Sequence, residues 1–149
     1  RQKETDEMKM VIGGTFQGKL AYAKERYQIT DGWIDGAVCK REALGTCKGV
    51  YHFHELIRNM IQDSKKDQSW ITGAVNQAEA FAAWLYEKNP EIVIVTNELG
   101  YGIVPMDQFD REYREMTGRI CSALAKRSEE VVRVACGLGM VIKSAKETI

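Results

Sequence analysis

The residues best suited to chemistry form a glycine-rich stretch near the start of the chain, Gly13-Gly14-Thr15-Phe16-Gln17-Gly18-Lys19. A short apolar run, residues 8–12, precedes it, and a helix-forming segment, residues 20–27, follows it. Strand, Gly-x-x-x-x-Gly-Lys and helix in this order are the arrangement of a phosphate-binding P-loop. Glycines let backbone N–H groups converge on an anion, and the helix N-terminus adds further donors. Lys19 would add a full positive charge, so we predict that this stretch binds nucleotide phosphates.

The match departs from the usual pattern immediately after Lys19. The pattern continues with Ser or Thr, whose hydroxyl binds Mg²⁺, whereas this chain has Leu20, which carries no ligating atom. Phe16 and Gln17 are also bulky for such a loop. The alternative interpretation is a glycine turn that joins a strand to a helix and binds nothing. The predicted phosphate-binding residues are Gly13, Gly14, Thr15, Phe16, Gln17, Gly18, Lys19 and Leu20.

A second polar group follows a β-branched apolar run, residues 91–96, which is typical of a buried parallel strand. Asn97 and Glu98 stand at its carboxyl end, where ligands bind in open α/β sheets. We predict that Asn97 contacts the nucleotide, and that Glu98 orients a water on Mg²⁺ or accepts a substrate proton. The alternative role for Glu98 is a carboxylate that caps the following loop.

The chain has two histidines, His52 and His54. Either is a candidate catalytic nucleophile that accepts a nucleotidyl group, because neutral imidazole is nucleophilic near pH 7. The alternative is two side chains at the start of a helix, since an apolar stripe of helical spacing begins at Phe53. Histidines two residues apart do not share a helical face, so we predict no metal site there.

Composition describes an ordinary globular chain of 149 residues, with 44% apolar and 28% charged residues. This length predicts one domain, residues 1–149, with polar tails at residues 1–7 and 144–149. The 21 basic residues balance 21 acidic ones, so no long-range attraction to nucleic acid or acidic membranes is expected. No apolar run approaches the roughly 20 residues that span a bilayer.

The four cysteines are scattered, with no Cys-x-x-Cys spacing, so neither a zinc site nor a redox pair is predicted. Cys121 and Cys136 lie in apolar stretches and are predicted to be buried thiols. A reducing, cytoplasmic setting is the expectation.

Helical and strand patterns alternate along the chain. The expected helices are residues 20–27, 50–61, 76–87 and 107–127, and the expected strands are residues 8–12, 91–96, 131–136 and 140–143. Residues 64–69 are expected to be a solvated loop, and Asn76 and Asp107 to cap the helices that they begin. Gly118 interrupts the last helix at a cost of about 1 kcal/mol relative to Ala, which close packing or ligand approach would explain. The alternation predicts an α/β fold, an open, mostly parallel sheet with helices on both faces and an antiparallel edge strand.

The segment Val-Thr-Asn-Glu-Leu-Gly-Tyr-Gly-Ile-Val-Pro, residues 95–105, resembles a segment of the adenosylcobinamide kinase / adenosylcobinamide-phosphate guanylyltransferase family of cobalamin biosynthesis. The helix that carries Gly118-Arg119 and the ending of residues 137–143 are also similar. The resemblance implies a P-loop, RecA-like fold and a transferase that uses GTP or ATP, with Mg²⁺, and an adenosylcobinamide-type corrinoid. Members of this family phosphorylate the corrinoid's aminopropanol hydroxyl and then transfer GMP through a guanylylated histidine. The resemblance also implies a homo-oligomer, a trimer. The candidate catalytic residues that the sequence itself offers are Lys19, Glu98, His52 and His54.

The chain departs from the family pattern in three places. Leu20 replaces the Ser or Thr of the P-loop, and no histidine-bearing helix is evident between Asp31 and Gly49. The interior strand that normally precedes residues 93–96, with an acidic residue at its end, has no evident match. The chain therefore resembles a shortened member. The alternatives to an active enzyme are a nucleotide-binding member with little catalysis, acting as a subunit or regulator, and an α/β interaction domain with an empty loop.

Overall fold

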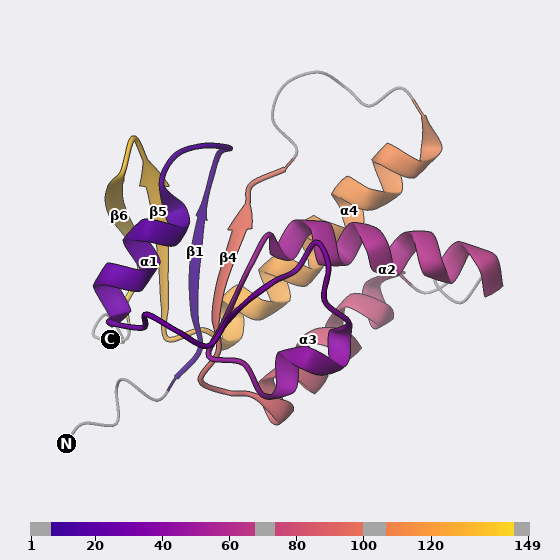
Figure 1. Ribbon diagram of the computed structural model, residues 1–149. Helices are drawn as coiled ribbons and strands as arrows, with labels where there is room; N and C mark the ends of the chain where they lie inside the picture. The colour runs from indigo at the N-terminus through magenta and orange to yellow at the C-terminus, as the bar shows by residue number, and fades with distance from the viewer. Residues whose placement is uncertain (1–6, 68–73, 100–106, 145–149) are drawn as a thin grey trace.

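A six-stranded sheet forms the centre of the protein in the computed structural model, which describes residues 7–67, 74–99 and 107–144 (Figure 1). The strand order is β2-β3-β4-β1-β5-β6. All neighbours pair in parallel except β5 and β6, which form an antiparallel hairpin at one edge. The strands are β1 (Lys9–Gly13), β2 (Trp33–Asp35), β3 (Gly49–Tyr51), β4 (Val93–Asn97), β5 (Glu130–Ala135) and β6 (Leu138–Lys143).

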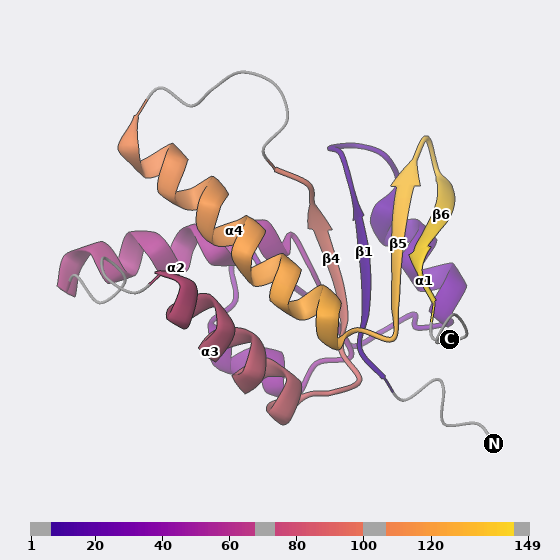
Figure 2. The ribbon, with the colours of Figure 1, turned by 180° about the vertical axis from the view of Figure 1, so that it is seen from behind.

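Helices cover both faces of this sheet, as the sequence predicted. Helix α1 lies against one face, and α2, α3 and α4 lie against the other (Figures 1 and 2). A short 3-10 helix, η2, joins β2 to β3. The helices are α1 (Lys19–Tyr27), η2 (Arg41–Gly45), α2 (Phe53–Asp67), α3 (Ala74–Lys88) and α4 (Gln108–Arg127). None of the described helices is long and apolar enough to pass through a bilayer.

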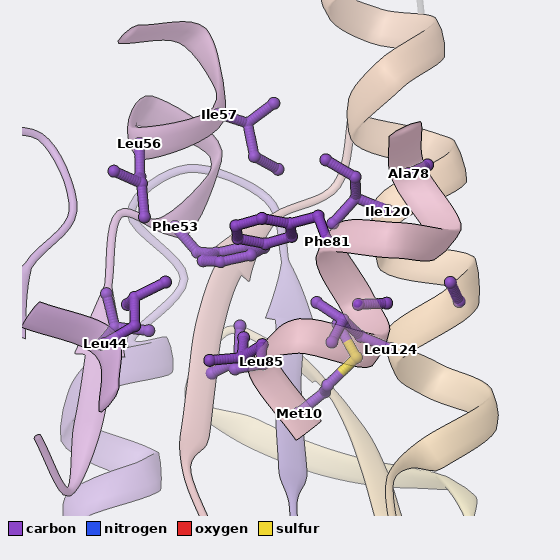
Figure 3. Close-up of a cluster of buried hydrophobic side chains, with 14 of the residues drawn as sticks. Met10, Leu44, Phe53, Leu56, Ile57, Ala78, Phe81, Leu85, Ile120 and Leu124 are labelled. Atoms are coloured by element: carbon purple, nitrogen blue, oxygen red, sulfur yellow. The ribbon is translucent and has the colours of Figure 1, made fainter. Parts of the chain in front are cut away.

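The larger core lies between the sheet and the three helices α2, α3 and α4 (Figure 3). Phe53 and Phe81 meet at its centre with their ring centroids 6.2 Å apart, and both are almost completely buried. On the opposite face, Ala23 of α1 packs on the valines of β1, β4 and β5. The central strand β1 is therefore clamped from both sides, which fixes the position of the loop that follows it.

The interior strand that the sequence analysis found missing is present. Strand β3 pairs with β4 in parallel and lies inside the sheet, but it ends at Tyr51 and is followed by His52, so the acidic residue expected at its end is absent. The prediction was wrong because β3 is only three residues long and its apolar residues continue without a break into the stripe of α2. A strand this short shows no alternation of its own. His52, with a positive φ of 55°, makes the turn between them.

Helix boundaries account for most of the remaining differences. Helix α2 continues to Asp67 instead of ending before residue 64, and Ser64 is buried with its hydroxyl donating to Ile61 O. Helix α3 begins at Ala74, so Asn76 lies inside it and does not cap it. The Asp107 cap is confirmed, because its side chain accepts a hydrogen bond from the backbone N–H of Asp110 at 2.7 Å.

The two cysteines predicted to be buried behave differently. Cys121 lies on α4 against the larger core, and burial raises the pKa of its thiol to about 12. Cys136 is exposed, because it occupies the tight turn between β5 and β6 with a φ of 54°. The apolar residues that precede Cys136 belong to the interior strand β5, but Cys136 itself lies beyond the end of that strand, in the hairpin turn.

Candidate nucleotide-binding site

The loop between β1 and α1, residues 13–18, lies at the carboxyl end of the parallel strands (Figure 1). We call it the glycine loop. A Cβ on Gly13 would lie 2.4 Å from the carbonyl oxygen of Val134, so no larger residue fits there. Gly18 has a φ of 84° and stands at the N-terminus of α1, where no side chain caps the helix. Glycine is required at both positions for the chain to turn this tightly from strand to helix.

Three contacts hold the glycine loop from outside. The N–H of Gly137 donates to Gln17 O at 2.8 Å, and the N–H of Cys136 donates to the side-chain oxygen of Gln17 at 2.6 Å. The N–H of Glu98 donates to Gly13 O at 2.8 Å. Gln17, which the sequence marked only as bulky, therefore ties the loop to the β5–β6 turn. The sequence does not indicate that Gln17 anchors the loop, because its hydrogen-bond partners lie more than a hundred residues further along the chain.

Several backbone N–H groups of the glycine loop are not engaged by the rest of the described protein. Within the described residues, the N–H groups of Gly14, Thr15, Phe16 and Gln17 donate no hydrogen bond. The ring of Phe16 is 98% exposed and does not fill the loop. Unengaged N–H groups at a helix N-terminus are the arrangement that binds anions. The loop therefore keeps backbone donors, beside the N-terminus of α1, that an anion could engage.

Lys19 lies inside the glycine loop. Its side chain is almost completely buried, and its ammonium donates to Gly14 O at 2.7 Å. Burial lowers the pKa of Lys19, and the negative charge of Glu98 opposes that shift. Glu98 itself accepts a hydrogen bond from Arg133 Nε at 2.9 Å, across the end of β1. Lys19 and Glu98, both predicted from the sequence, thus lie at the carboxyl ends of the strands, and Arg133 lies beside Glu98.

A cavity of about 660 Å³ opens beside the loop, between α1 and the carboxyl ends of β3 and β4. This volume is in the range of small-molecule sites. Of the predicted residues it brings together Asn97, both histidines and most of the glycine loop. Its lining residues are Thr15, Phe16, Gln17, Gly18, Lys19, Leu20, Ala21, Ala37, Tyr51, His52, His54, Glu55, Val95, Thr96 and Asn97.

The two histidines stand on this cavity in different environments. His52 is half exposed, and its Nδ1 lies 2.9 Å from Oδ1 of Asp35, at the end of β2. Burial raises the pKa of Asp35, but hydrogen bonds from Ala37 N–H and His52 outweigh it and leave this pKa below its usual value. The carboxylate therefore orients the His52 ring.

His54 is nearly buried, and its Nδ1 accepts a hydrogen bond from the backbone N–H of Asn97 at 3.3 Å. Burial lowers the pKa of His54 to about 4, although the Glu55 carboxylate, 3.6 Å from Nε2, raises it. The ring is thus neutral near pH 7, with its proton on Nε2. The Asn97 side chain donates to the Thr15 hydroxyl at 3.0 Å, which joins β4 to the glycine loop.

Within the described residues, the glycine loop offers no hydroxyl ligand for a protein-held Mg²⁺ ion. Leu20 lines the cavity with no oxygen where the P-loop pattern places a hydroxyl, and the Thr15 hydroxyl is already bonded to Asn97. Among the described residues, no group of three or more His, Cys, Asp and Glu side chains is placed to hold a metal. The cation that this chain itself offers to phosphates at the loop is Lys19.

A mostly parallel sheet, a glycine loop after its central strand and a lysine buried in that loop define a P-loop α/β fold. The family model described as cobinamide kinase / cobinamide phosphate guanyltransferase matches residues 50–142, beginning in β3. A relative from Escherichia coli (strain K12), the bifunctional adenosylcobalamin biosynthesis protein CobU, is 32% identical over 93% of this chain and 80% of the relative. The chain therefore belongs to the cobinamide kinase / cobinamide phosphate guanyltransferase family.

Two further relatives match shorter parts. The Salmonella typhimurium protein of the same name is 43% identical over 36% of this chain and 29% of its own length. The bifunctional adenosylcobalamin biosynthesis protein CobP of Pseudomonas aeruginosa is 36% identical over 45% of this chain and 39% of its own. The resemblance stated from the sequence is confirmed at the level of the family.

Proposed function

We propose that this chain is a transferase of cobalamin biosynthesis that binds a purine nucleoside triphosphate, GTP or ATP, with its phosphates in the glycine loop. The observation that carries this proposal is the position of Lys19, buried in a loop of unengaged N–H groups at the mouth of a cavity of about 660 Å³. A polyphosphate would replace the bond from Lys19 to Gly14 O with charge-assisted ones. Family membership supplies the acceptor, a cobinamide-type alcohol.

In the kinase step, the acceptor hydroxyl oxygen attacks the γ-phosphorus, and the bond from that phosphorus to the bridging oxygen breaks. The nucleoside diphosphate leaves, and the hydroxyl proton passes to a carboxylate or to water. Lys19 and the loop N–H groups stabilise the charge that develops on the phosphate oxygens. Glu98 lies close enough to raise the pKa of Lys19, so a carboxylate is present near the predicted phosphate position.

In the guanylyl-transfer step, a histidine nitrogen attacks the α-phosphorus of GTP and pyrophosphate leaves. A phosphate oxygen of the phosphorylated cobinamide then attacks the same phosphorus, and the histidine leaves. Of the two candidates, His52 suits this role better, because Asp35 binds its Nδ1 while half of the ring stays accessible. His54 is buried, with Nδ1 engaged by Asn97, so neither nitrogen is free to attack.

A direct assay tests both steps. Purified protein is incubated with GTP or ATP, Mg²⁺ and adenosylcobinamide, and the products are separated by chromatography. Phosphorylated or GDP-linked product that disappears with Lys19→Ala supports the proposal. For the histidine, α-labelled GTP should leave acid-labile label on the wild type and on His54→Asn but not on His52→Asn. Label that remains on His52→Asn would overturn the assignment of His52 as the nucleophile, but not the rest of the proposed function.

A second candidate function is a nucleotide-binding family member with little catalysis, acting as a subunit or regulator. Leu20 favours it, because the hydroxyl that usually holds Mg²⁺ is absent. Saturable nucleotide binding without product would support this second function. A trimer is the assembly that the resemblance implies, and light scattering on the purified protein would test it.

A further inference from the structure

Glu98 and Arg133 form an ion pair that crosses the end of the central strand. Arg133 Nε on β5 donates to Oε1 of Glu98, which directly follows β4, at 2.9 Å. Strand β1 lies between β4 and β5, and its Ile12 is the residue opposite Arg133 (Figure 2). The pair therefore joins two strands that are not neighbours. Neither Glu98 nor Arg133 is among the described residues that line the nucleotide cavity.

The same carboxylate lies beside Lys19. The backbone N–H of Glu98 donates to Gly13 O at 2.8 Å, which fixes Glu98 next to the first residue of the glycine loop. The side chain of Lys19 passes over this glycine, because a Cβ on Gly13 would lie 3.4 Å from Lys19 Cδ. Burial lowers the pKa of Lys19, and the charge of Glu98 opposes that shift, so the two groups interact. Glu98 is thus shared between two cations.

This sharing affects the cation that the loop offers to phosphates. In the free protein the Lys19 ammonium donates to Gly14 O at 2.7 Å, a neutral acceptor that an anionic phosphate oxygen can replace. A carboxylate binds an ammonium more strongly than a carbonyl does. Only 17% of the Glu98 side chain is exposed, so its charge is poorly screened by solvent. Without a partner of its own, this carboxylate would attract Lys19 and repel an incoming phosphate.

We propose that Arg133 is a positioning residue for nucleotide binding, which holds the Glu98 carboxylate in an ion pair and so leaves Lys19 available to the phosphates of a nucleoside triphosphate. This inference rests on the proposed function, in which Lys19 binds those phosphates. Arg133 acts through Glu98 and does not touch the nucleotide. Its effect on affinity therefore depends on the negative charge of Glu98 and disappears when that charge is removed.

A purely structural ion pair would behave differently. If the pair served only to hold the end of β4 against β5, losing either side chain would have the same effect. Ion pairs of this kind also contribute little to stability when one partner is accessible, and the Arg133 side chain is 44% exposed. The sign of the effect of removing the Glu98 charge distinguishes the two roles.

Four variants test the proposal: Arg133→Met, Arg133→Lys, Glu98→Gln and the double variant that combines Arg133→Met with Glu98→Gln. The matched control is Arg119→Met, which removes the arginine of an exposed ion pair of 2.8 Å with Glu115 on α4. Calorimetric titration with GTP and with ATP, without corrinoid and at one ionic strength, measures nucleotide affinity. Melting temperatures establish that each variant is folded during the titration.

Arg133→Met should bind both nucleotides about fivefold more weakly than the wild type, the size expected for one partly exposed ion pair. Arg133→Lys keeps the positive charge and should recover most of that loss. Glu98→Gln should bind nucleotide no more weakly than the wild type, and the double variant should bind as Glu98→Gln does. Arg119→Met should bind as the wild type does.

Wild-type affinity in Arg133→Met overturns this inference. A double variant that binds as weakly as Arg133→Met also overturns it, because Arg133 would then not act through Glu98. Equal weakening in Arg133→Met and Glu98→Gln would show a structural pair and would equally contradict the proposal. These three outcomes leave the proposed function intact, whereas a wild-type protein that binds neither GTP nor ATP overturns both.

Discussion

The glycine loop and the nearby residues of α2 and α4 both lie at the carboxyl ends of the strands, but the two regions are formed by different parts of the chain. The loop uses the backbone, and its shape depends on Gly13, Gly18 and three external hydrogen bonds. The opposite wall, by which we mean His54 and Thr117, uses polar side chains that are buried. We infer that the loop determines whether a nucleotide binds, whereas the wall adjusts stability. The predictions below test that division, beginning with the largest effect.

Lys19→Ala should weaken nucleotide binding most. Removing one charge-assisted contact to phosphate is expected to reduce affinity about a hundredfold, and calorimetric titration with GTP and ATP measures it. The melting temperature should not fall, because Lys19 is buried and its charged form is disfavoured there. Lys24→Ala, which removes a lysine from the last turn of the same helix, is the control. Equal nucleotide affinity in both variants would show that the loop does not bind phosphates through Lys19.

Replacing each of two adjacent loop glycines, Gly13 and Gly14, by alanine should have very different effects on the stability of the protein. In Gly13→Ala the new Cβ would lie 2.4 Å from Val134 O, so we expect a loss of about 2 kcal/mol of unfolding free energy. In Gly14→Ala the nearest atom is Gln17 Cγ at 3.7 Å, an ordinary contact. Calorimetry should show a clear fall in melting temperature for the first variant alone. Equal melting temperatures would mean that the loop can move away from β5.

The loop was predictable from the sequence because its determinants are local. The spacing of Gly13, Gly18 and Lys19 between a strand and a helix was sufficient to predict it, and the fold class followed from the alternation of apolar patterns. The short strand β3 was missed because three residues carry no periodicity. The Asp35–His52 pair and the Gln17 anchor could not be predicted, because each joins residues that only the tertiary structure brings together.

The opposite wall should make stability depend on pH through His54. Its pKa is about 4 when folded and near 6.5 when unfolded, so protonation favours the unfolded chain. The stabilisation is complete above pH 6.5 and is lost as the pH falls towards 4. Between pH 7.5 and pH 5 we expect a loss of about 2 kcal/mol from this one group.

Urea unfolding at the two pH values, in the wild type and in His54→Gln, measures that contribution. The variant should lose less stability on acidification than the wild type, because glutamine does not titrate. His52→Gln is the matched control, since its ring is half exposed and lies beside a carboxylate. If acidification destabilises His54→Gln and the wild type equally, then His54 is not held neutral by burial.

The smallest effect should come from Gly118→Ala, and it should have the opposite sign to that of Gly13→Ala. The new Cβ meets nothing within 4 Å, and alanine is favoured over glycine in a helix interior by up to about 1 kcal/mol. We therefore expect a melting temperature about 2–4 °C higher, measured by calorimetry without ligand. An unchanged or lower melting temperature would show that the backbone of α4 needs glycine there, so the residue would be structural. A gain in stability would instead mean that alanine is tolerated at this exposed position and that helix propensity alone decides the effect.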